Sequence, residues 1–171
     1  MCRGRIACYR RLEHERSGKM ISRKMVINEA RTWIGTRFQH QGRVKRTELH
    51  DGGCDCIGFV LGVADRLQLK DKNGNLITRH DRSDYGRIPN GESFKQALHK
   101  HLDEVPLAEV KAGDLVLFRF DANPQHIGIA TDYIYGGRGI LHCYAEARKV
   151  VETRLDEQWL LMADSSYNFI Y

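Results

Sequence analysis

Three side chains that lie far apart in the sequence have the chemistry of a thiol–imidazole catalytic site. Cys56 follows two glycines and Asp55, and it stands where a strongly apolar helical pattern begins. The free amides and the positive dipole end at a helix start favour a thiolate, which is a nucleophile. Asp55 is well placed to be the N-cap of that helix. The alternative is an ordinary buried cysteine that packs as a small hydrophobe.

His126 and His142 are the candidates for the imidazole that a thiolate nucleophile needs. In a strand, His126 shares its face with a Gly and an Ala, while Ile127 and Ile129 fill the other face. We expect a helix to lie close against the small residues, so that His126 points at the helix beginning near Cys56. If the next strand pairs antiparallel, His142 stands beside His126 and orients it. A structural strand histidine is the alternative.

Two other uses of these residues remain open. Cys54, Cys56, His126 and His142 could be zinc ligands, but one residue between the cysteines is tighter than usual structural zinc spacing. Cys54 could instead resolve an oxidised Cys56, although the pair is not a Cys-x-x-Cys motif. We expect a site without a metal or cofactor. The histidines expected to be solvated surface groups are His14, His50, His80, His99 and His101.

The elements that must position these residues form an α+β chain, with helices in the first half and an antiparallel sheet in the second. The predicted helices are Lys24–Trp33, Asp55–Leu69, Glu92–Leu102 and the short Asp156–Met162. The predicted strands are Asp114–Phe120, His126–Tyr133, Gly139–Tyr144, Lys149–Leu155 and Ser165–Tyr171. The predicted loops are Thr36–Gly53 and Lys70–Asn90, the second with a small hairpin at Asn73-Gly74.

Charge and composition limit the function classes. The chain has 171 residues and a net charge of +5, but residues 1–24 carry eight Lys/Arg against two Glu. Residues 25–171 are therefore near neutral and carry no basic stripe for nucleic acid. No apolar run reaches the roughly 18–20 residues of a membrane span. We expect a poorly ordered basic leader over 1–24 and a single domain over 25–171.

The cysteines and the N-terminal segment indicate where the protein is made. The five cysteines fit no secreted disulfide framework, and residues 1–24 contain no apolar core of a signal peptide. We therefore expect synthesis in the reducing cytosol without a signal peptide.

Several motifs together resemble one family. Residues 55–59, Asp-Cys-Ile-Gly-Phe, resemble the Asp-Cys-Ser-Gly-Phe signature of NlpC-type cell-wall peptidases. Residues 112–118 resemble the Gly-Asp-Leu-Val-Phe-Phe strand that precedes the family histidine, and 126–129 resemble its His-Val-Gly-Ile motif. The segment with His142, followed by 149–152, matches the family's third polar residue and its next strand.

The resemblance covers about residues 25–165 and implies a papain-like α+β fold, with the catalytic Cys at a helix start packed on the sheet. It implies thiol cleavage of peptidoglycan stem peptides, most often between D-glutamate and a diamino acid. By motif position, Cys56 is the nucleophile, His126 the general base and His142 the orienting group. The stem peptide is the implied partner, and no cofactor is implied.

A subgroup is also implied. Residues 29–36 and 39–42 resemble the proteins encoded by tailed phages and gene-transfer agents, which sit with tail-tip genes. That resemblance implies other tail-tip proteins as partners, and a tail component of the virion that acts on the cell wall.

The departures from the family concern substrate binding. Arg37 and Phe38 stand where the family has Pro-Tyr, and Phe38 cannot donate a hydrogen bond. This favours a rival reading as a structural tail-tip protein of little activity, and the same site would also suit an amidase or an acyltransferase. Candidate substrate-binding residues are Arg37, Phe38, Gln41 and Asp55, and the loop bases that could bind stem carboxylates are Arg37, Arg43, Lys45 and Arg46. Solvated loop charges are the alternative for these bases.

Overall fold

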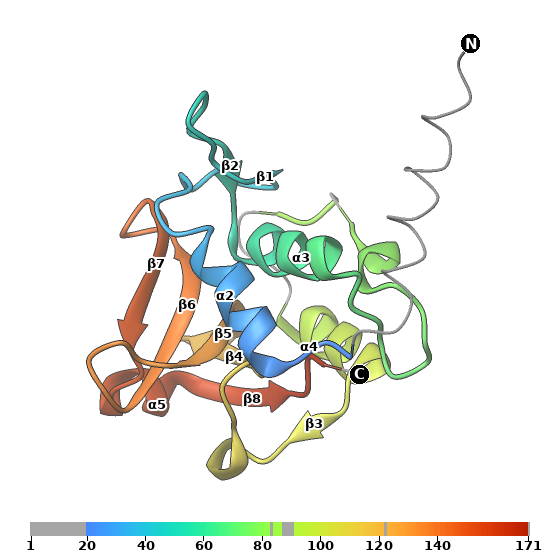
Figure 1. The fold of residues 1–171 in the computed structure, drawn as a ribbon. Coiled ribbons are helices and arrows are strands. Elements are labelled where there is room, and N and C mark those ends of the chain that lie inside the picture. Colours follow the sequence, from blue (N-terminus) through green and yellow to red (C-terminus); the bar gives the residue numbers. More distant parts are fainter. Residues whose placement is uncertain (1–19, 83, 87–90, 122, 171) are drawn as a thin grey trace.

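A six-stranded antiparallel sheet with helices on both faces forms the body of the protein (Figure 1). The computed structural model describes residues 20–82, 84–86, 91–121 and 123–170. The sheet runs in the order β3-β8-β4-β5-β6-β7, which confirms the predicted α+β fold. Its strands are β3 (Glu104–Val105), β4 (Leu115–Phe120), β5 (Asn123–Asp132), β6 (Arg138–Tyr144), β7 (Lys149–Arg154) and β8 (Ala163–Tyr167).

The helices lie close to their predicted positions. They are α2 (Arg23–Arg31), α3 (Cys56–Leu67), α4 (Gly91–His101) and α5 (Glu157–Met162), with 3₁₀ turns η1 (Ile77–His80) and η2 (Leu107–Glu109). The predicted leader, residues 1–24, lies outside the described residues as far as residue 19, whereas Arg23 and Lys24 belong to α2. Among the described residues, no helix is long and apolar enough to cross a membrane.

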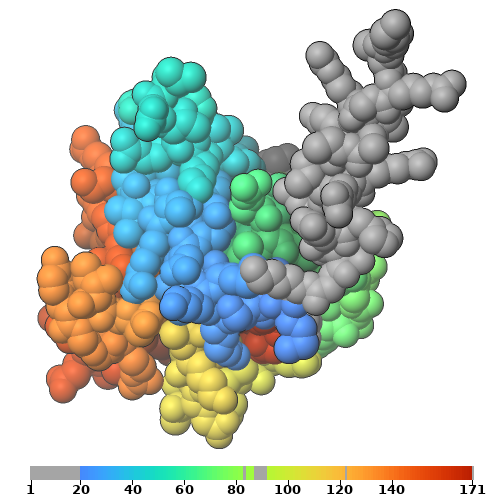
Figure 2. Space-filling view, in the orientation of Figure 1, coloured from blue at the N-terminus to red at the C-terminus, as the bar shows by residue number. Residues whose placement is uncertain are grey.

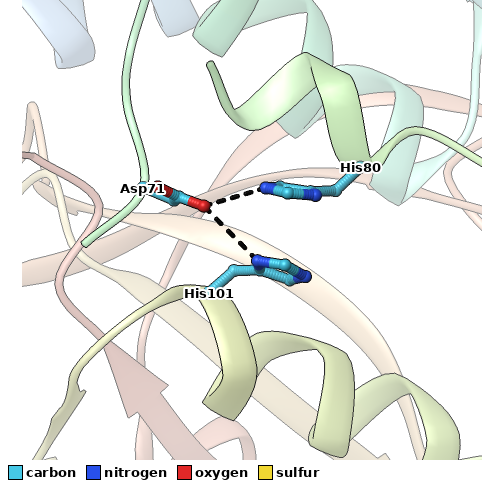
Figure 3. Close-up of side chains that lie close together, drawn as sticks. All are labelled: Asp71, His80 and His101. Atoms are coloured by element: carbon cyan, nitrogen blue, oxygen red, sulfur yellow. Dashed lines mark hydrogen bonds and ion pairs between the residues drawn. The ribbon is translucent and has the colours of Figure 1, made fainter. Parts of the chain in front are cut away.

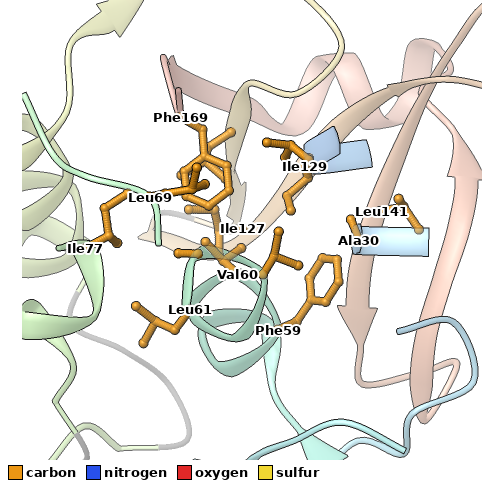
Figure 4. Packing of buried hydrophobic residues seen from close by; sticks show 14 of the residues in the cluster. Ala30, Phe59, Val60, Leu61, Leu69, Ile77, Ile127, Ile129, Leu141 and Phe169 are labelled. Carbon is orange, nitrogen blue, oxygen red and sulfur yellow. The ribbon is translucent and has the colours of Figure 1, made fainter. Parts of the chain in front are cut away.

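The main core lies between the sheet and α2, α3 and α4 (Figure 4). Phe59 and Val63 of α3 are fully buried and belong to one cluster with Ile127 and Ile129 of β5. Each such side chain contributes roughly 1.5–3 kcal/mol by leaving water. This packing fixes α3, and with it Cys56, on the sheet.

The prediction that α3 packs on the face of β5 that carries His126 is therefore wrong: the His126 ring lies on the opposite face, 5.9 Å from the ring of Phe118 and 6.2 Å from that of Trp159. α3 packs against the bulky Ile127 and Ile129, whereas Ala130 belongs to a second cluster on the opposite face, packed by Trp159 of α5. The prediction took small residues as a sign of close helix approach. In the fold, Gly128 instead makes room within the sheet, because a Cβ there would lie 2.7 Å from Ile140 Cγ1.

Strands β5 and β6 separate at one end, and this matters for the site. Their pairing runs from Asp132↔Arg138 to Ile129↔Leu141 and stops there, whereas β5 stays paired with β4 as far as Asn123. The amide of Ala130 bonds to Asp114 on the β4 side. Amide directions alternate along a strand, so the amide of Ile127 faces the opening between β5 and β6.

Some short elements were not predicted. The predicted loop Thr36–Gly53 contains a two-stranded ribbon, β1 (Arg43–Val44) and β2 (Gly53–Cys54), whose connection stands out from the molecule in Figure 2. In the predicted loop Lys70–Asn90, an isolated bridge between Lys70 and Leu76 closes the expected small hairpin. Strand β3 was missed. The last strand ends at Tyr167 rather than Tyr171.

Candidate active site

Cys56 is the first residue of α3 because Asp55 caps this helix. Asp55 Oδ1 accepts a hydrogen bond from the Gly58 amide at 2.8 Å, which confirms the predicted N-cap. A Cβ on Gly58 would lie 1.9 Å from the carbonyl oxygen of Gly42, so the loop before β1 crosses the first helical turn at very close range. Together these contacts hold the partly buried Cys56 at one end of the sheet.

The Cys56 thiol lies at the opening between β5 and β6, where the amide of Ile127 faces it. Burial, and next the negative charge of Asp55, raise its pKa to about 12, although the amides of Ile127, Ile57 and Cys56 itself lower it. The resting group is therefore a neutral thiol. The described residues contain no hydrogen bond between this thiol and an imidazole.

His126 and His142 lie side by side, as expected for two antiparallel strands with both histidines on one face, although the β5–β6 pairing ends before them at Ile129↔Leu141. The two rings are joined by a hydrogen bond of 2.8 Å between His126 Nε2 and His142 Nδ1. His142 Nε2 in turn lies 3.2 Å from the hydroxyl of Thr153 on β7. Burial and the neighbouring His142 hold the pKa of His126 well below its usual 6.5, and burial lowers the pKa of His142 to about 4. Both imidazoles are neutral near pH 7.

Aromatic rings enclose the histidine pair. Trp159 of α5 meets His142 edge to face, with ring centroids 4.8 Å apart, and the Tyr144 ring stacks on His142 at 5.3 Å. Phe118 and Phe120 of β4 lie within 6 Å of the His126 ring. This enclosure keeps water from the bond between the imidazoles, and a hydrogen bond is stronger in such a surrounding.

Asp55 is also the centre of a polar network at the start of α3. Its Oδ2 accepts from the Gln41 amide at 2.7 Å and from the Tyr85 hydroxyl at 2.6 Å. Arg43 lies 3.3 Å from Asp55 Oδ1 and donates to Asp81 at 2.9 Å and to the Tyr85 hydroxyl at 2.9 Å. Burial, and next the bond to Asp55, raise the pKa of Tyr85, which stays a donor.

With this geometry in view, the chain can be compared with known proteins. The family model of the NlpC/P60 family matches residues 35–163. The chain belongs to the NlpC/P60 family. Members of this family are cysteine peptidases and amidases that hydrolyse peptidoglycan. Among curated protein sequences, none matches this chain significantly.

Solved structures share the fold at low sequence identity. The NlpC/P60 domain of the peptidoglycan hydrolase SagA is 20% identical, with a TM-score of 0.56, covering 86% of this chain and 99% of that one. An NlpC/P60 family protein from Bacillus cereus is 18% identical, with a TM-score of 0.59, covering 90% of this chain and 42% of that one. An N-acetylmuramoyl-L-alanine amidase from Bacteroides uniformis is 11% identical, with a TM-score of 0.53, covering 87% and 98%.

The predicted substrate-binding residues divide into two groups in this NlpC/P60 domain. Gln41 joins Asp55 in the network at the helix start. Arg37 and Phe38 lie beside β2, where the Arg37 carbonyl and the Gln39 amide both bond to the backbone of Cys54. The Arg37 side chain is 71% exposed, and its ion pair with the equally exposed Asp51 is long, at 3.5 Å.

Besides Arg37, two of the four candidate loop bases form ion pairs, and their partners include buried or partly buried carboxylates. Lys45 lies 3.1 Å from Glu29 of α2. Arg43 belongs to the network around Asp55. The Arg46 side chain lies against Gly35, where a Cβ would be 2.9 Å from Arg46 Nη1. Arg37, whose ion pair with Asp51 is long and exposed, and the exposed Arg46 are therefore the candidate bases that are available to a substrate.

Sequence reasoning missed three residues of this NlpC/P60 site. Thr153 lies two residues after Val151 and therefore on the same face of β7. Because Val151 is paired with His142, strand periodicity could have identified Thr153 as a neighbour of His142. Trp159 lies in a helix that was predicted, but no sequence signal connects it with the histidines. Tyr85 lies in a polar loop, and only tertiary structure brings it to Asp55.

Two histidines expected to be solvated are not. His80 donates to the fully buried carboxylate of Asp71 at 2.9 Å, and His101 lies 3.4 Å from the same oxygen. The expectation failed because each histidine lies in a polar context locally and meets Asp71 only in the fold. Within the described part of the chain, these three residues, and not the cysteines with His126 and His142, form the group close enough to hold a metal.

A cavity of about 640 Å³ lies on the α3 side of the sheet. Its walls are mainly apolar side chains of α3 and α4, and Ile57, Tyr85 and Ile127 border it next to the site. Neither Cys56 nor the paired histidines line it. The reacting groups therefore lie at the sheet opening beside this cavity rather than inside it.

Proposed function

We propose that the protein hydrolyses amide bonds in peptidoglycan stem peptides, with Cys56 as nucleophile and His126 as general base. His142 orients His126. The observation that carries the proposal is the 2.8 Å bond between the two buried imidazoles, together with the Cys56 thiol at the start of α3, which faces the amide of Ile127, the residue after His126. Membership of the NlpC/P60 family supports the substrate class.

Two sets of tautomers satisfy both hydrogen bonds of the pair, and the proposed mechanism uses the set that leaves His126 Nδ1 unprotonated. His126 donates its Nε2 proton to His142 Nδ1, and His142 donates its Nε2 proton to the Thr153 hydroxyl. His126 Nδ1 then carries a lone pair, and it is the nitrogen that receives the thiol proton. Donation in this direction, from His126 through His142 to Thr153, prepares His126 to act as a base.

The reaction follows from these protonation states. The Cys56 sulfur attacks the stem-peptide carbonyl while its proton passes to His126, because a thiol of pKa about 12 does not ionise beforehand. The imidazolium then donates its proton to the leaving amine as the C–N bond breaks. Water, deprotonated by His126, hydrolyses the thioester and regenerates the thiol.

Two features of the site suit the substrate. The amide of Cys56, at the start of α3, is a donor for the oxyanion of the tetrahedral intermediate. The exposed Arg37, beside β2, is one candidate for binding a free stem carboxylate. We assign the D-glutamyl–diamino acid bond as the bond cleaved, which is supported by the resemblance of residues 55–59 and 126–129 to the NlpC-type peptidases.

A digest of purified muropeptides tests the activity and the bond together. Mass spectrometry of wild-type and Cys56→Ala digests should show a stem fragment cut after D-glutamate in the wild type alone. Release of a whole stem peptide from muramic acid would mean that the protein is an amidase. Identical product profiles for the two proteins would exclude a Cys56 hydrolase.

A non-catalytic member of the family is the second candidate. Two observations favour it: Phe38 has no hydroxyl, and the resting thiol has no imidazole bond within the described residues. The muropeptide digest separates it from the enzyme. We further propose a location in a phage tail, supported by the resemblance of residues 29–36 and 39–42, and mass spectrometry of purified virions tests that location.

A further inference from the structure

Asp71, His80 and His101 meet outside the candidate active site (Figure 3). Asp71 lies in the turn after α3, His80 is the last residue of η1 and His101 is the last residue of α4. Three separate segments of the chain therefore contribute one side chain each. Both imidazoles direct a nitrogen at Asp71 Oδ2, at 2.9 Å from His80 Nε2 and 3.4 Å from His101 Nδ1. One atom of each residue lies within 4.8 Å of the other two.

The carboxylate of Asp71 is held in place for this role. Its Oδ1 accepts from the amides of Asn73 and Asn75, each at 2.9 Å, and the side chain is fully buried. Lys72 binds the same turn to the end of α4, through its contacts with the carbonyl oxygens of His99 and Leu102. Carboxylates that ligate metals are commonly oriented by such hydrogen bonds.

One nitrogen of the cluster is unsatisfied. His101 Nδ1 is buried and has no hydrogen-bond partner among the described residues, although it lies 3.4 Å from the Asp71 carboxylate. A buried polar atom without a partner is costly, and an ion at the site is one of the ordinary explanations. The 3.4 Å contact contributes to the lowered pKa of Asp71, but its geometry does not satisfy the His101 nitrogen.

We propose that Asp71, His80 and His101 bind one divalent transition-metal ion of the zinc class. Two imidazoles and one carboxylate suit such an ion, whereas calcium and magnesium prefer oxygen ligands. Ligand atoms about 2.0–2.1 Å from a tetrahedral ion lie roughly 3.3 Å apart. The observed 2.9 and 3.4 Å separations are close to that value.

Binding requires one local adjustment. The rings of His80 and His101 are stacked, with centroids 3.5 Å apart and planes 22° apart, so the two nitrogens directed at Asp71 lie side by side. The rings must tilt apart, and His80 Nε2 must lose to solvent or to its own Nδ1 the proton that it donates to Asp71, before both nitrogens can bind one ion. Both side chains are partly exposed and border the cavity beside α3, so they have room to tilt and water can occupy the fourth position.

The ion would stabilise the loop that borders the candidate active site. His80 directly precedes Asp81, which binds Arg43, and Arg43 reaches Asp55 at the start of α3. Tyr85 comes from the same loop. The ion therefore has a structural role, and it contacts none of the reacting groups.

Zinc titration of the full chain tests this proposal. The protein is prepared without a polyhistidine tag and in a Cys56→Ala background, stripped with a chelator, and titrated with Zn²⁺ against a chromophoric competitor. We expect one Zn²⁺ per chain, and an affinity reduced at least about tenfold in His80→Gln and in His101→Gln. His50→Gln, which alters an exposed loop histidine, is the matched control.

A histidine variant could lose zinc binding because it fails to fold, so the site is also measured with all three ligands intact. X-ray absorption at the zinc edge should show two imidazoles and oxygen ligands without sulfur, and saturating Zn²⁺ should raise the Tm. Sulfur ligands, less than one ion per chain, or equal affinity in all three histidine variants would overturn the proposal. The muropeptide digest does not depend on this result, so the two proposals fail separately.

Discussion

Two histidine pairs in this protein meet in opposite ways. His126 and His142 lie on neighbouring strands, joined edge to edge by a 2.8 Å hydrogen bond and surrounded by aromatic rings. His80 and His101 come from a 3₁₀ turn and a helix end, stacked face to face at 3.5 Å beside a buried carboxylate. The first pair is buried, and the second is partly exposed.

The third partner of each pair determines its chemistry. Thr153 is a neutral group, so nothing beside His126 and His142, the sheet pair, offsets the cost of burying a charge. Both imidazoles therefore stay neutral bases. Burial raises the pKa of Asp71, but the contacts with Asn75, His80, Asn73 and His101 outweigh it and lower the pKa, so the carboxylate stays charged. A charged carboxylate beside two imidazoles attracts a cation. The sheet pair is therefore suited to proton transfer, and His80 and His101, the loop pair, are suited to ion binding.

Removal of the base gives the largest expected effect. His126→Gln preserves a polar group facing His142 but cannot accept the thiol proton, so we expect kcat on muropeptides to fall by about a thousandfold or more. His50→Gln should leave kcat unchanged. If His126→Gln retains most of the activity while its Tm matches the wild type, His126 is not the base. The assignment of proton transfer to the sheet pair would then be wrong.

Acid destabilisation is the next largest effect and belongs to the sheet pair. The pKa of His142 is 6.5 in an ordinary setting and about 4 in the fold, so the unfolded chain binds more protons between these values. The free energy of unfolding should therefore decrease as the pH falls from 6.5 towards 4, by roughly 3 kcal/mol from this residue. Urea unfolding at a series of pH values measures it.

The matched variant isolates this contribution. His142→Gln cannot titrate, so its unfolding free energy should change less between pH 7 and pH 4 than that of the wild type. Asp71, whose pKa is lowered from 3.8, retains its contribution throughout this range and loses it only at lower pH. Parallel curves for wild type and His142→Gln would show that His142 is not held neutral by burial.

The difference between the pairs also explains what could be predicted from the sequence. Strand periodicity is a local rule, and it puts His126 and His142 on one face once two adjacent antiparallel strands are recognised, even though their pairing ends at Ile129↔Leu141. The N-cap at Asp55 is equally local. His80 and His101 meet only because η1 and α4 pack around the turn at Asp71, and no periodicity in the sequence reports that packing.

Two further failures of prediction also arose from long-range packing. The choice of which face of β5 receives α3 depends on the whole core, where bulky Ile127 and Ile129 gain more from burial than small residues do. Tyr85 reaches Asp55 through a loop whose path is set by Arg43 and Asp81. Long-range packing, rather than local pattern, determines both outcomes.

The smallest effect concerns Thr153, which acts on the reaction only through His142. Thr153→Val removes the acceptor for His142 Nε2 at nearly constant shape, so the tautomer that prepares His126 is held less firmly. We expect kcat to fall by a few fold and the free energy of unfolding to change by about 1 kcal/mol or less. Thr153→Ser restores the hydroxyl and should recover kcat, which a purely packing role of the methyl group would not allow. If valine and serine behave alike, the hydrogen-bonded chain ends at His142, and the neutral state of the sheet pair depends on its aromatic enclosure alone.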